Sequence, residues 1–370
     1  MNEPVCRWGI LGAANIARKN WQAIRNAPNC ALVAVASRDL QRCRQFIEGC
    51  QADAPHAVTP QAMGSYEELI ARPDIDAVYL PLPTVSRKPW AIRAAEAGKH
   101  VLSEKPVGAT AGDVREILEA CRRNRVQFMD GVMFLHSQRL GRMRDVLDDG
   151  QRVGRIRRIA TQFSFCGDAA FLANDIRLNS RLEPLGCLGD LGWYNIGFIL
   201  WAMKYQLPLT VTGQMLNAHR GREGATEVPT EFTGELRYDD GVSASFYCSF
   251  LTENQQWVSV SGTRGELYVR DFVLPFYGSE VAFQASRPVF EITGCDFNME
   301  DHSQRIAVRE YSNSAANAQE TRLFDRFAQL VLSGKSDARW GEIALHTQTV
   351  LDACLQSAQS GGQAVPVATG

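Results

Sequence analysis

Two oppositely charged side chains, Glu104 and Lys105, directly follow the apolar run at residues 100–103 and directly precede Pro106. The residue before a proline is driven from the α region into extended backbone, so the backbone at Lys105 is restricted. An amine held in this way can orient a hydroxyl or carbonyl group and stabilise negative charge that develops on its oxygen. A strand-to-helix turn with a solvated ion pair explains the same residues, because exposed ion pairs contribute little stability.

Asp190 and Tyr194 stand four residues apart, so on a helix they face the same way. The phenol supplies a proton and the carboxylate an acceptor, which are the parts needed for acid–base work on a carbinol–carbonyl pair. By spacing alone, a helix-start Asp and an amphipathic Tyr explain them better. Arg177 and His136 are candidate substrate-binding residues, and a structural ion pair and a packed histidine are their alternatives.

The elements that must position these side chains differ between the two halves. Over residues 1–131 short apolar runs alternate with helical stretches, the pattern of βαβ units around a parallel sheet. We expect strands at residues 7–11, 31–36, 77–80 and 100–102 and helices at 16–26 and 90–98. Parallel sheets bind ligands at the carboxyl ends of their strands, which is where Glu104 and Lys105 would stand.

A turn of small residues joins the first strand to the first helix. Gly12, Ala14 and Ala17 occupy the three small positions of a dinucleotide-binding fingerprint, with alanine in place of its second glycine. Such a turn lets a pyrophosphate approach a helix N-terminus, although small residues also serve plain packing. We assign these residues to cofactor binding: Gly12, Ala13, Ala14, Asn15 and Ile16.

The end of the second strand indicates which dinucleotide binds. An Asp or Glu there grips a free ribose 2′-hydroxyl, whereas Arg accommodates a 2′-phosphate. Ser37 and Arg38 stand at this end, with Arg42 one helical turn further on. Because Arg forms charge-assisted bonds to phosphate, these three residues favour NADP, and Asp39 keeps NAD as the alternative.

The second half, residues 132–370, reads as a separate α+β domain with a large, mostly antiparallel open sheet. Strands are expected at 156–165, 231–238, 243–250, 258–261, 266–269 and 281–284, and helices at 140–148, 188–203, 322–333 and 341–360. The polar stretch 294–318 is expected to be a long loop. Phe246, Tyr247, Phe250 and Trp257 are expected on the outer sheet face, where a second copy of the chain would cover them, and the domain's own core is the alternative place for them.

Composition excludes several functional classes of protein. The 370 residues carry a formal net charge of −2, so no basic field recruits nucleic acid or an anionic membrane. We expect no membrane span and no signal peptide, because an apolar strand follows almost directly on Met1. The ten cysteines form no CxxC pair and no zinc-like spacing with histidine, which predicts no metal and reduced thiols in a cytoplasmic protein.

These motifs together resemble the Gfo/Idh/MocA oxidoreductase family. The matching runs are GILG at 9–12, AGKHVL at 97–102 leading into EKP at 104–106, and LGDLGWY at 188–194. The chain is most similar to the branch of glucose–fructose oxidoreductase and dimeric dihydrodiol dehydrogenase, and to plant-type relatives that share the segment RLEPLGCLGDLGWYNI. The runs span both halves in the family's order.

The resemblance implies a Rossmann domain, NADP or NAD, and hydride transfer on a secondary alcohol or ketone of a sugar, polyol or cyclic diol. It implies catalytic roles for Lys105, Asp190 and Tyr194, and a homodimer or higher homo-oligomer formed through the C-terminal sheet. The residues that we expect around the nicotinamide are Leu80, Pro81, Leu82, Pro83, Arg87, Glu104 and Lys105. Arg87 departs from the family's usual histidine.

Two other functions occur on this fold. One is glycoside cleavage, in which the nicotinamide oxidises and re-reduces the sugar in place. The other is sensing of a dinucleotide by a regulator without turnover. The presence of Lys105, Asp190 and Tyr194 together argues against the pure sensor.

Overall fold

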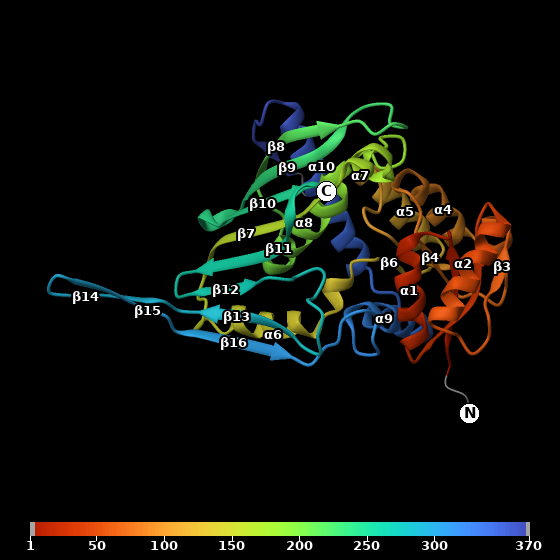
Figure 1. Ribbon diagram of the computed structural model, residues 1–370, viewed down its shortest axis with the longest axis horizontal. Coiled ribbons are helices and arrows are strands. Elements are labelled where there is room, and N and C mark those ends of the chain that lie inside the picture. The colour runs from red at the N-terminus through yellow and green to blue at the C-terminus, as the bar shows by residue number, and fades with distance from the viewer. Residues whose placement is uncertain (1–3, 368–370) are drawn as a thin grey trace. The chain divides into compact units, whose positions relative to one another are not determined.

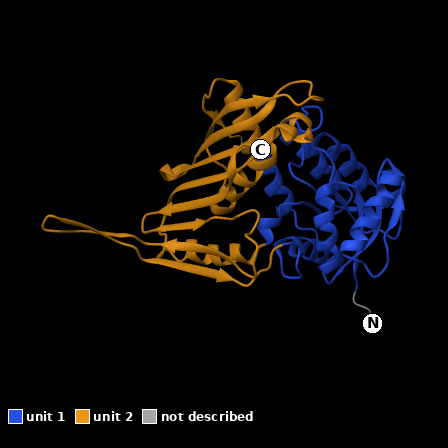
Figure 2. Ribbon diagram, in the orientation of Figure 1, with its two compact units in different colours: residues 1–136, 179–184, 313–348 blue, residues 137–178, 185–312, 349–370 orange. Residues whose placement is uncertain are grey.

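The computed structural model describes residues 4–367 and divides the chain into two compact units (Figure 2). Unit 1 comprises Met1–His136, Asn179–Pro184 and Asn313–Gln348, and unit 2 comprises Ser137–Leu178, Leu185–Ser312 and Thr349–Gly370. The expected boundary at 131/132 lies close to the end of the first segment of unit 1. The return of two later segments to unit 1 was not expected from the sequence.

Unit 1 is built on a six-stranded parallel sheet with the order β3-β2-β1-β4-β5-β6. This is the doubly wound order of dinucleotide-binding folds. Its strands are β1 (Cys6–Leu11), β2 (Cys30–Ala36), β3 (Gln61–Met63), β4 (Ala77–Leu80), β5 (His100–Ser103) and β6 (Phe128–Asp130). The α/β fold that we expected for the first half is confirmed.

Helices connect these strands, and several begin at side chains that cap them. Asp39 caps α2, Ser65 caps α3, and Thr110 forms a capping box with Asp113 at α5, as is favourable at helix N-termini. The helices are α1 (Asn15–Asn26), α2 (Leu40–Asp53), α3 (Tyr66–Ile70), α4 (Thr84–Glu96), α5 (Ala111–Arg123) and the 3₁₀ turn η1 (Met133–His136).

The helix α9 (Gln319–Ser333) explains why unit 1 is discontinuous in sequence. It packs against α1, β1 and β2, and its Phe324 lies edge-on to the buried Trp8 with ring centroids 5.1 Å apart. The last helix, α10 (Arg339–Gln359), begins in unit 1 and ends in unit 2. An apolar face on α9 is covered only because the chain returns to the first sheet.

Unit 2 contains a nine-stranded sheet with the order β16-β13-β12-β11-β7-β10-β9-β8-β17 (Figure 1). The β7–β10 pair is parallel and the other neighbours are antiparallel, which confirms the mostly antiparallel sheet. The strands are β7 (Ile156–Cys166), β8 (Thr210–His219), β9 (Val228–Arg237), β10 (Ser243–Ser249), β11 (Leu251–Gly262), β12 (Glu266–Val269), β13 (Val281–Ser286), β16 (Ser303–Val308) and β17 (Val365–Pro366).

The helix α8 (Trp193–Ala202) forms the core of unit 2, and all ten of its residues are buried. Asn195 on this helix donates from Nδ2 to the Thr161 hydroxyl on β7 at 3.0 Å. The other helical elements are α6 (Gln138–Asp148), α7 (Ala169–Asn174), the 3₁₀ turns η2 (Ile176–Leu178) and η4 (Asp239–Gly241), and the π-helix η3 (Leu188–Gly192).

Two expectations for this half are wrong. Phe246 and Phe250 do not lie on an outer face: both are buried, and Phe246 stacks on Phe232. The expected loop at 294–318 contains β16 and one strand of a hairpin formed by β14 (Val289–Thr293) and β15 (Asp296–Glu300). β15 is exposed throughout and β16 is a largely exposed edge strand. Residues 296–300 do alternate polar and apolar side chains, but the polar composition of the whole stretch indicated a loop.

Candidate active site

The glycine turn between β1 and α1 leaves a helix N-terminus open. Gly12 has φ of +128°, which L side chains rarely adopt, and a Cβ there would lie 3.3 Å from Leu82 Cδ2. No side chain caps α1, and no acidic residue lies in its first turn. Free amides at such a terminus suit an anion such as a pyrophosphate. The residues Gly12 to Ile16 therefore fit a dinucleotide.

The end of β2 and the start of α2 lie next to this turn. The Arg42 guanidinium donates from Nη2 to the Ala13 carbonyl at 3.3 Å, while Arg38 is exposed next to Ser37. The Asp39 carboxylate accepts from the amides of Gln41 and Arg42 at 2.9 and 3.1 Å. Both cap hydrogen bonds go to Asp39 Oδ1, so this oxygen is already engaged. Guanidinium groups bind phosphate and a carboxylate binds a ribose hydroxyl, so the preference between NADP and NAD stays a prediction.

The phenol of Tyr66 is influenced by the positive charges of the arginine side chains near the end of β2. Burial is the main influence and raises the pKa of Tyr66, while the positive charges of Arg38 and Arg42 act in the opposite direction. Both guanidinium groups therefore act on the same phenol. The structure brings together Arg38 and Arg42, which the sequence had grouped by their spacing alone.

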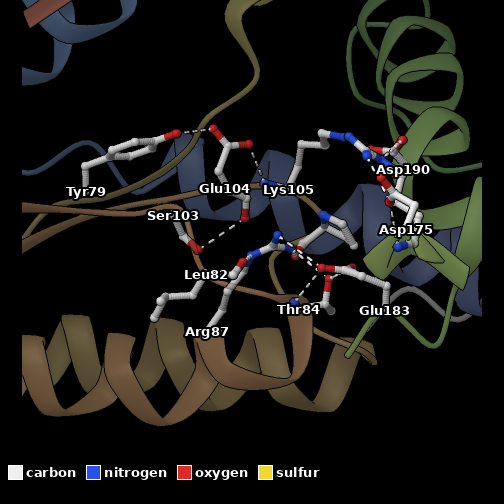
Figure 3. A network of polar contacts seen from close by, with 12 residues as sticks. Tyr79, Leu82, Thr84, Arg87, Ser103, Glu104, Lys105, Asp175, Glu183 and Asp190 are labelled. Carbon is white, nitrogen blue, oxygen red and sulfur yellow. Dashed lines mark hydrogen bonds and ion pairs between the residues drawn. The ribbon is translucent and has the colours of Figure 1, made fainter. Parts of the chain in front are cut away.

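A buried network lies directly behind Lys105 (Figure 3). Tyr79, on β4, donates from its hydroxyl to Glu104 Oε1 at 2.6 Å and accepts from Asn20 Nδ2 at 2.5 Å. The other carboxylate oxygen of Glu104 accepts from the Lys105 amide at 3.3 Å. Burial and the charge of Glu104 raise the pKa of Tyr79, so its phenol stays protonated and donates at neutral pH. The Glu104 side chain thus anchors the backbone amide of the lysine.

Arg87 anchors the residue after the lysine. Its buried guanidinium donates to the carbonyl of Pro106, to the carbonyl of Leu82 at 2.7 Å and to the Thr84 hydroxyl at 2.9 Å. The Glu183 carboxylate lies 3.8 Å away and accepts from the Thr84 amide at 3.0 Å. We expected Arg87 among residues that contact the cofactor. The structure shows it joining the two loops after β4 and β5 (Figure 3), and its contact with the cofactor stays a prediction.

In unit 2, Asp190 lies in the π-helix η3 and Tyr194 in the first turn of α8. The helix that the spacing argument assumed therefore contains a π-helical turn, and such turns are frequent at functional sites. Tyr194 is buried and its ring lies edge-on to Phe163, with centroids 5.6 Å apart. Asp190 and Tyr194 thus lie on one continuous helical segment.

Arg177 is an ion-pair partner of Asp190. Its Nε lies 2.7 Å from Asp190 Oδ2, and its Nη1 lies 3.2 Å from Asp175 Oδ1. Figure 3 labels both carboxylates, Asp175 and Asp190. Asp190 is the main cause of the raised pKa of Arg177, with burial acting in the opposite direction. Arg177 therefore holds the carboxylate that the sequence assigned to acid–base chemistry.

His136 stacks on Trp340 with ring centroids 4.8 Å apart and planes at 15°. Its Nε2 is buried and has no hydrogen-bond partner within the described residues 4–367. Burial, with the charge of Arg326, lowers the pKa of His136 to about 3, so the ring is neutral at physiological pH. The structure gives His136 a packing contact, and a substrate-binding role stays a prediction.

Three residues of these networks were missed by sequence analysis: Asn20, Tyr79 and Glu183. Tyr79 stands within an apolar strand, and Asn20 lies on the buried face of α1, so neither shows a local motif. Glu183 is 99 residues from Thr84. No short-range signal in the sequence connects these groups.

Two expected absences can be compared with the described part of the chain. Within residues 4–367 no group of three or more His, Cys, Asp or Glu side chains is placed to hold a metal ion. Across the same residues no helix is long and apolar enough to cross a bilayer.

Comparison with protein families places both halves of the chain. Residues 6–132 match the model of an oxidoreductase family with an NAD-binding Rossmann fold, named GFO_IDH_MocA. Residues 141–268 match a C-terminal domain of the GFO/IDH/MocA type. The two matched ranges together cover well over half of the chain and follow its two sheets.

Individual relatives agree with the match to the family models. Trans-1,2-dihydrobenzene-1,2-diol dehydrogenase of Bos taurus is 32% identical over 267 residues, or 72% of this chain and 74% of the relative. A dTDP-3,4-didehydro-2,6-dideoxy-α-D-glucose 3-reductase of Saccharopolyspora spinosa is 33% identical over 279 residues, or 74% of this chain and 77% of the relative.

A solved structure extends the likeness over nearly the whole chain. It is a mutant of a 3-ketoreductase from Actinomadura kijaniata, in complex with TDP-benzene and NADP. It superposes with a TM-score of 0.79 at 25% identity and covers 96% of this chain and 98% of its own. With the family models and the curated relatives, this likeness shows that the chain belongs to the Gfo/Idh/MocA family of oxidoreductases.

Proposed function

We propose that this protein is an NADP-dependent oxidoreductase that moves a hydride between the nicotinamide and a secondary alcohol or ketone of a sugar, polyol or cyclic diol. The observation that carries the proposal is the anchoring of Lys105 at the carboxyl end of β5, between the Glu104–Tyr79 network and the Arg87–Pro106 contact. The names of the relatives, a dihydrodiol dehydrogenase and dTDP-sugar 3-reductases, support the substrate class.

The proposal divides cofactor binding among three groups of residues. The turn from Gly12 to Ile16 and the uncapped N-terminus of α1 hold the pyrophosphate. Ser37, Arg38 and Arg42 hold the 2′-phosphate, and the engagement of Asp39 as a cap favours NADP over NAD. The nicotinamide end is assigned to Leu80, Pro81, Leu82, Pro83, Glu104 and Lys105. Arg87 contributes to this end through the two loops that it joins.

The nicotinamide, when bound, supplies or accepts the hydride. Tyr194 gives a proton to the carbonyl oxygen during reduction and takes it back during oxidation. The positive charge of Lys105 favours the phenolate form of Tyr194. The same charge orients the carbonyl oxygen of the substrate. Asp190, held by Arg177, accepts from the substrate hydroxyl or from the lysine.

A substrate panel tests the proposal. The purified protein is incubated with NADP⁺ or NADPH and a set of sugars, dTDP-sugars, polyols and cyclic diols. Nicotinamide absorbance and free-sugar release are followed together. Net change in nicotinamide absorbance with one member of the panel is the expected result. Sugar release without net change would indicate glycoside cleavage, and tight cofactor binding without any turnover would indicate a sensor. Either outcome would replace the proposal.

The remaining expectations extend the proposal to the assembly. We propose a homodimer or higher homo-oligomer formed through unit 2, whose open sheet face carries the half-exposed Tyr247, Trp257 and Tyr268. The Trp257 and Tyr268 rings lie 6.3 Å apart on neighbouring strands. We also retain the cytoplasm as the compartment, on the basis of the cysteine spacing.

A further inference from the structure

The hairpin formed by β14 and β15 extends beyond the nine-stranded sheet (Figure 1). Residues directly opposite each other in an antiparallel pair point to the same face. The pairs Phe290–Met299 and Ile292–Phe297 therefore place four apolar side chains on one face. The opposite face carries the pairs Val289–Glu300, Glu291–Asn298 and Thr293–Asp296. The hairpin is amphipathic, with an acidic outer face.

The apolar face of the hairpin is uncovered in the single chain. Phe290, Ile292, Phe297 and Met299 are 54%, 59%, 71% and 66% exposed. The Phe290 and Phe297 rings stack with centroids 6.0 Å apart. An isolated two-stranded hairpin is marginally stable in water, and monomers rarely expose large contiguous apolar patches. Both facts indicate that another surface covers this face.

A second uncovered apolar group lies in the loop between β12 and β13. Leu274, Phe276 and Tyr277 are 44%, 59% and 90% exposed. The loop is well anchored, because the Leu274 amide donates to Gln256 Oε1 at 2.6 Å and the Phe276 amide donates to Asp271 Oδ2 at 2.9 Å. Asp271 is itself paired with the buried Arg139. The loop therefore presents its side chains from a fixed backbone.

We propose that the hairpin of one copy docks on the β12–β13 loop of a second copy, and that the contact is made twice in a two-fold dimer. The loop precedes β13 and the hairpin follows it, so the two patches lie at opposite ends of one strand. β13 lies next to β16, the strand at the edge of the sheet. Two copies placed antiparallel along this edge bring each hairpin to the other copy's loop, as an isologous interface requires.

The exposed area of the two patches supports a second copy of the chain as the partner. At roughly 200 Å² for a large side chain, the exposed fractions amount to roughly 500 Å² on the hairpin and roughly 400 Å² on the loop. A stable interface buries about 800 Å² per partner. The hairpin alone falls short of that area, whereas hairpin and loop together reach it in each copy.

Charge supports the same arrangement. The outer face of the hairpin carries Glu291, Asp296 and Glu300 and no basic residue. The loop patch is flanked by Arg270, whose guanidinium lies 5.8 Å from the Phe276 ring centroid. The positive charge of Arg270 attracts the acidic arm, which guides association, and like charges disfavour contact between two hairpins through their outer faces. Glu280, at the other end of the loop, is paired with Arg305.

The oligomeric state of the full-length protein tests this proposal by sedimentation velocity over 0.5–50 µM. The wild type is expected to be a dimer or an assembly of dimers. Phe297→Asp and Tyr277→Asp should each raise the Kd of the dimer by roughly 30-fold or more, because each places a charge in the apolar contact. The matched controls Asn298→Asp and Ser279→Asp add the same charge beside each site and should leave the Kd within about threefold. Unchanged far-UV circular dichroism and NADPH affinity establish that each variant is folded.

Mixing the two weakened variants tests the reciprocal contact. A heterodimer of Phe297→Asp with Tyr277→Asp retains one intact hairpin–loop contact, so it should form more readily than either homodimer. A wild type that stays monomeric at 50 µM would overturn the proposal. So would a dimer insensitive to Phe297→Asp, or one sensitive to Phe297→Asp but not to Tyr277→Asp. The substrate panel does not depend on this interface, so each proposal can fail alone.

Discussion

At the scale of single residues, Lys105 is held from both sides. Its amide donates to Glu104, whose other carboxylate oxygen accepts from Tyr79, and the carbonyl of Pro106 accepts from Arg87. Buried hydrogen bonds of this kind fix a backbone because leaving any of them unmade is costly. The ammonium therefore projects from a backbone with little freedom, as a group that must orient an oxygen atom requires.

Tyr194 can be tested as the proton donor. Tyr194→Phe removes the phenolic proton and keeps the ring that packs on Phe163. We expect turnover to fall by roughly 10²–10⁴-fold, the usual contribution of general acid–base catalysis. NADPH affinity, measured by fluorescence titration, should stay nearly unchanged. Lys105→Met should be comparably damaging. Near-normal turnover of Tyr194→Phe on a substrate with rate-limiting chemistry would exclude Tyr194, and Lys105 would become the remaining donor.

Cofactor preference can be tested at Arg38. Loss of one charge-assisted contact to the 2′-phosphate weakens binding by about 1.5–3 kcal/mol, or about tenfold and more. Arg38→Ala should therefore weaken NADPH binding by that factor and leave NADH binding unchanged. Arg44→Ala, at another exposed arginine nearby on α2, is the control and should change neither affinity. Equal affinity of the intact protein for both cofactors would contradict the assignment.

At the scale of elements, a buried arginine connects three separate segments of unit 1. Arg87 begins on α4 and reaches the loop after β4, the loop after β5 and the segment Asn179–Pro184. The Thr84 amide and hydroxyl, at the start of α4, both donate to Glu183. Short loops that end parallel strands thereby acquire a common support, because each supplies a carbonyl or hydroxyl to the same guanidinium.

Removal of this arginine should loosen both loops. Arg87→Met removes the donor to the carbonyl groups of Leu82 and Pro106 and the positive charge beside Glu183, which costs about 3 kcal/mol of unfolding free energy. It should also weaken NADPH binding, since both loops are assigned to the nicotinamide end. Lys88→Met makes the same chemical change at a surface ion pair, where we expect a loss of about 0–1 kcal/mol. Urea unfolding and NADPH titration measure both effects, and equal losses for the two variants would contradict this role.

At the scale of the whole molecule, unit 1 depends on segments far apart in the chain. Phe324 of α9 packs against Trp8 of β1, and Trp340 of α10 stacks on His136. Such contacts bury aromatic surface only when the chain has completed its passage through unit 2 and returned. We therefore expect residues 313–348 to unfold together with residues 4–136 when unit 1 unfolds.

Protonation of His136 makes the free energy of unfolding depend on pH. Its pKa of about 3 in the folded protein lies below the ordinary value of 6.5, so the unfolded chain binds an extra proton between these pH values. The free energy of unfolding therefore falls as pH decreases from about 6.5 toward 3, by up to about 2 kcal/mol at pH 5. His136→Phe should keep the aromatic stack and remove that part of the decline.

Urea unfolding at pH 7.5 and pH 5 measures this difference. His219→Phe, at an exposed histidine on β8, is the control and should decline with pH as the wild type does. If His136→Phe also declines like the wild type, the protonation of His136 does not contribute to acid sensitivity.

The local sequence determined much of the architecture. The strand at residues 77–80 matches β4 residue for residue, and the helix expected at 16–26 begins one residue early as α1. The motif at 104–106 stands at the carboxyl end of β5, as expected. Hydrophobic periodicity and turn residues act over a few positions, so they mark the strands, the helices and the edge of the sheet where ligands bind.

The tertiary structure decided what depends on contacts between distant positions. Arg87 looked like a departure at the cofactor site, and its burial against Glu183 became visible only when two segments 96 residues apart in number met. The return of α9 to the first sheet follows from aromatic packing that no local pattern encodes. β15 lies in the stretch expected to be a loop, and the register that pairs it with β14 is a property of the folded chain.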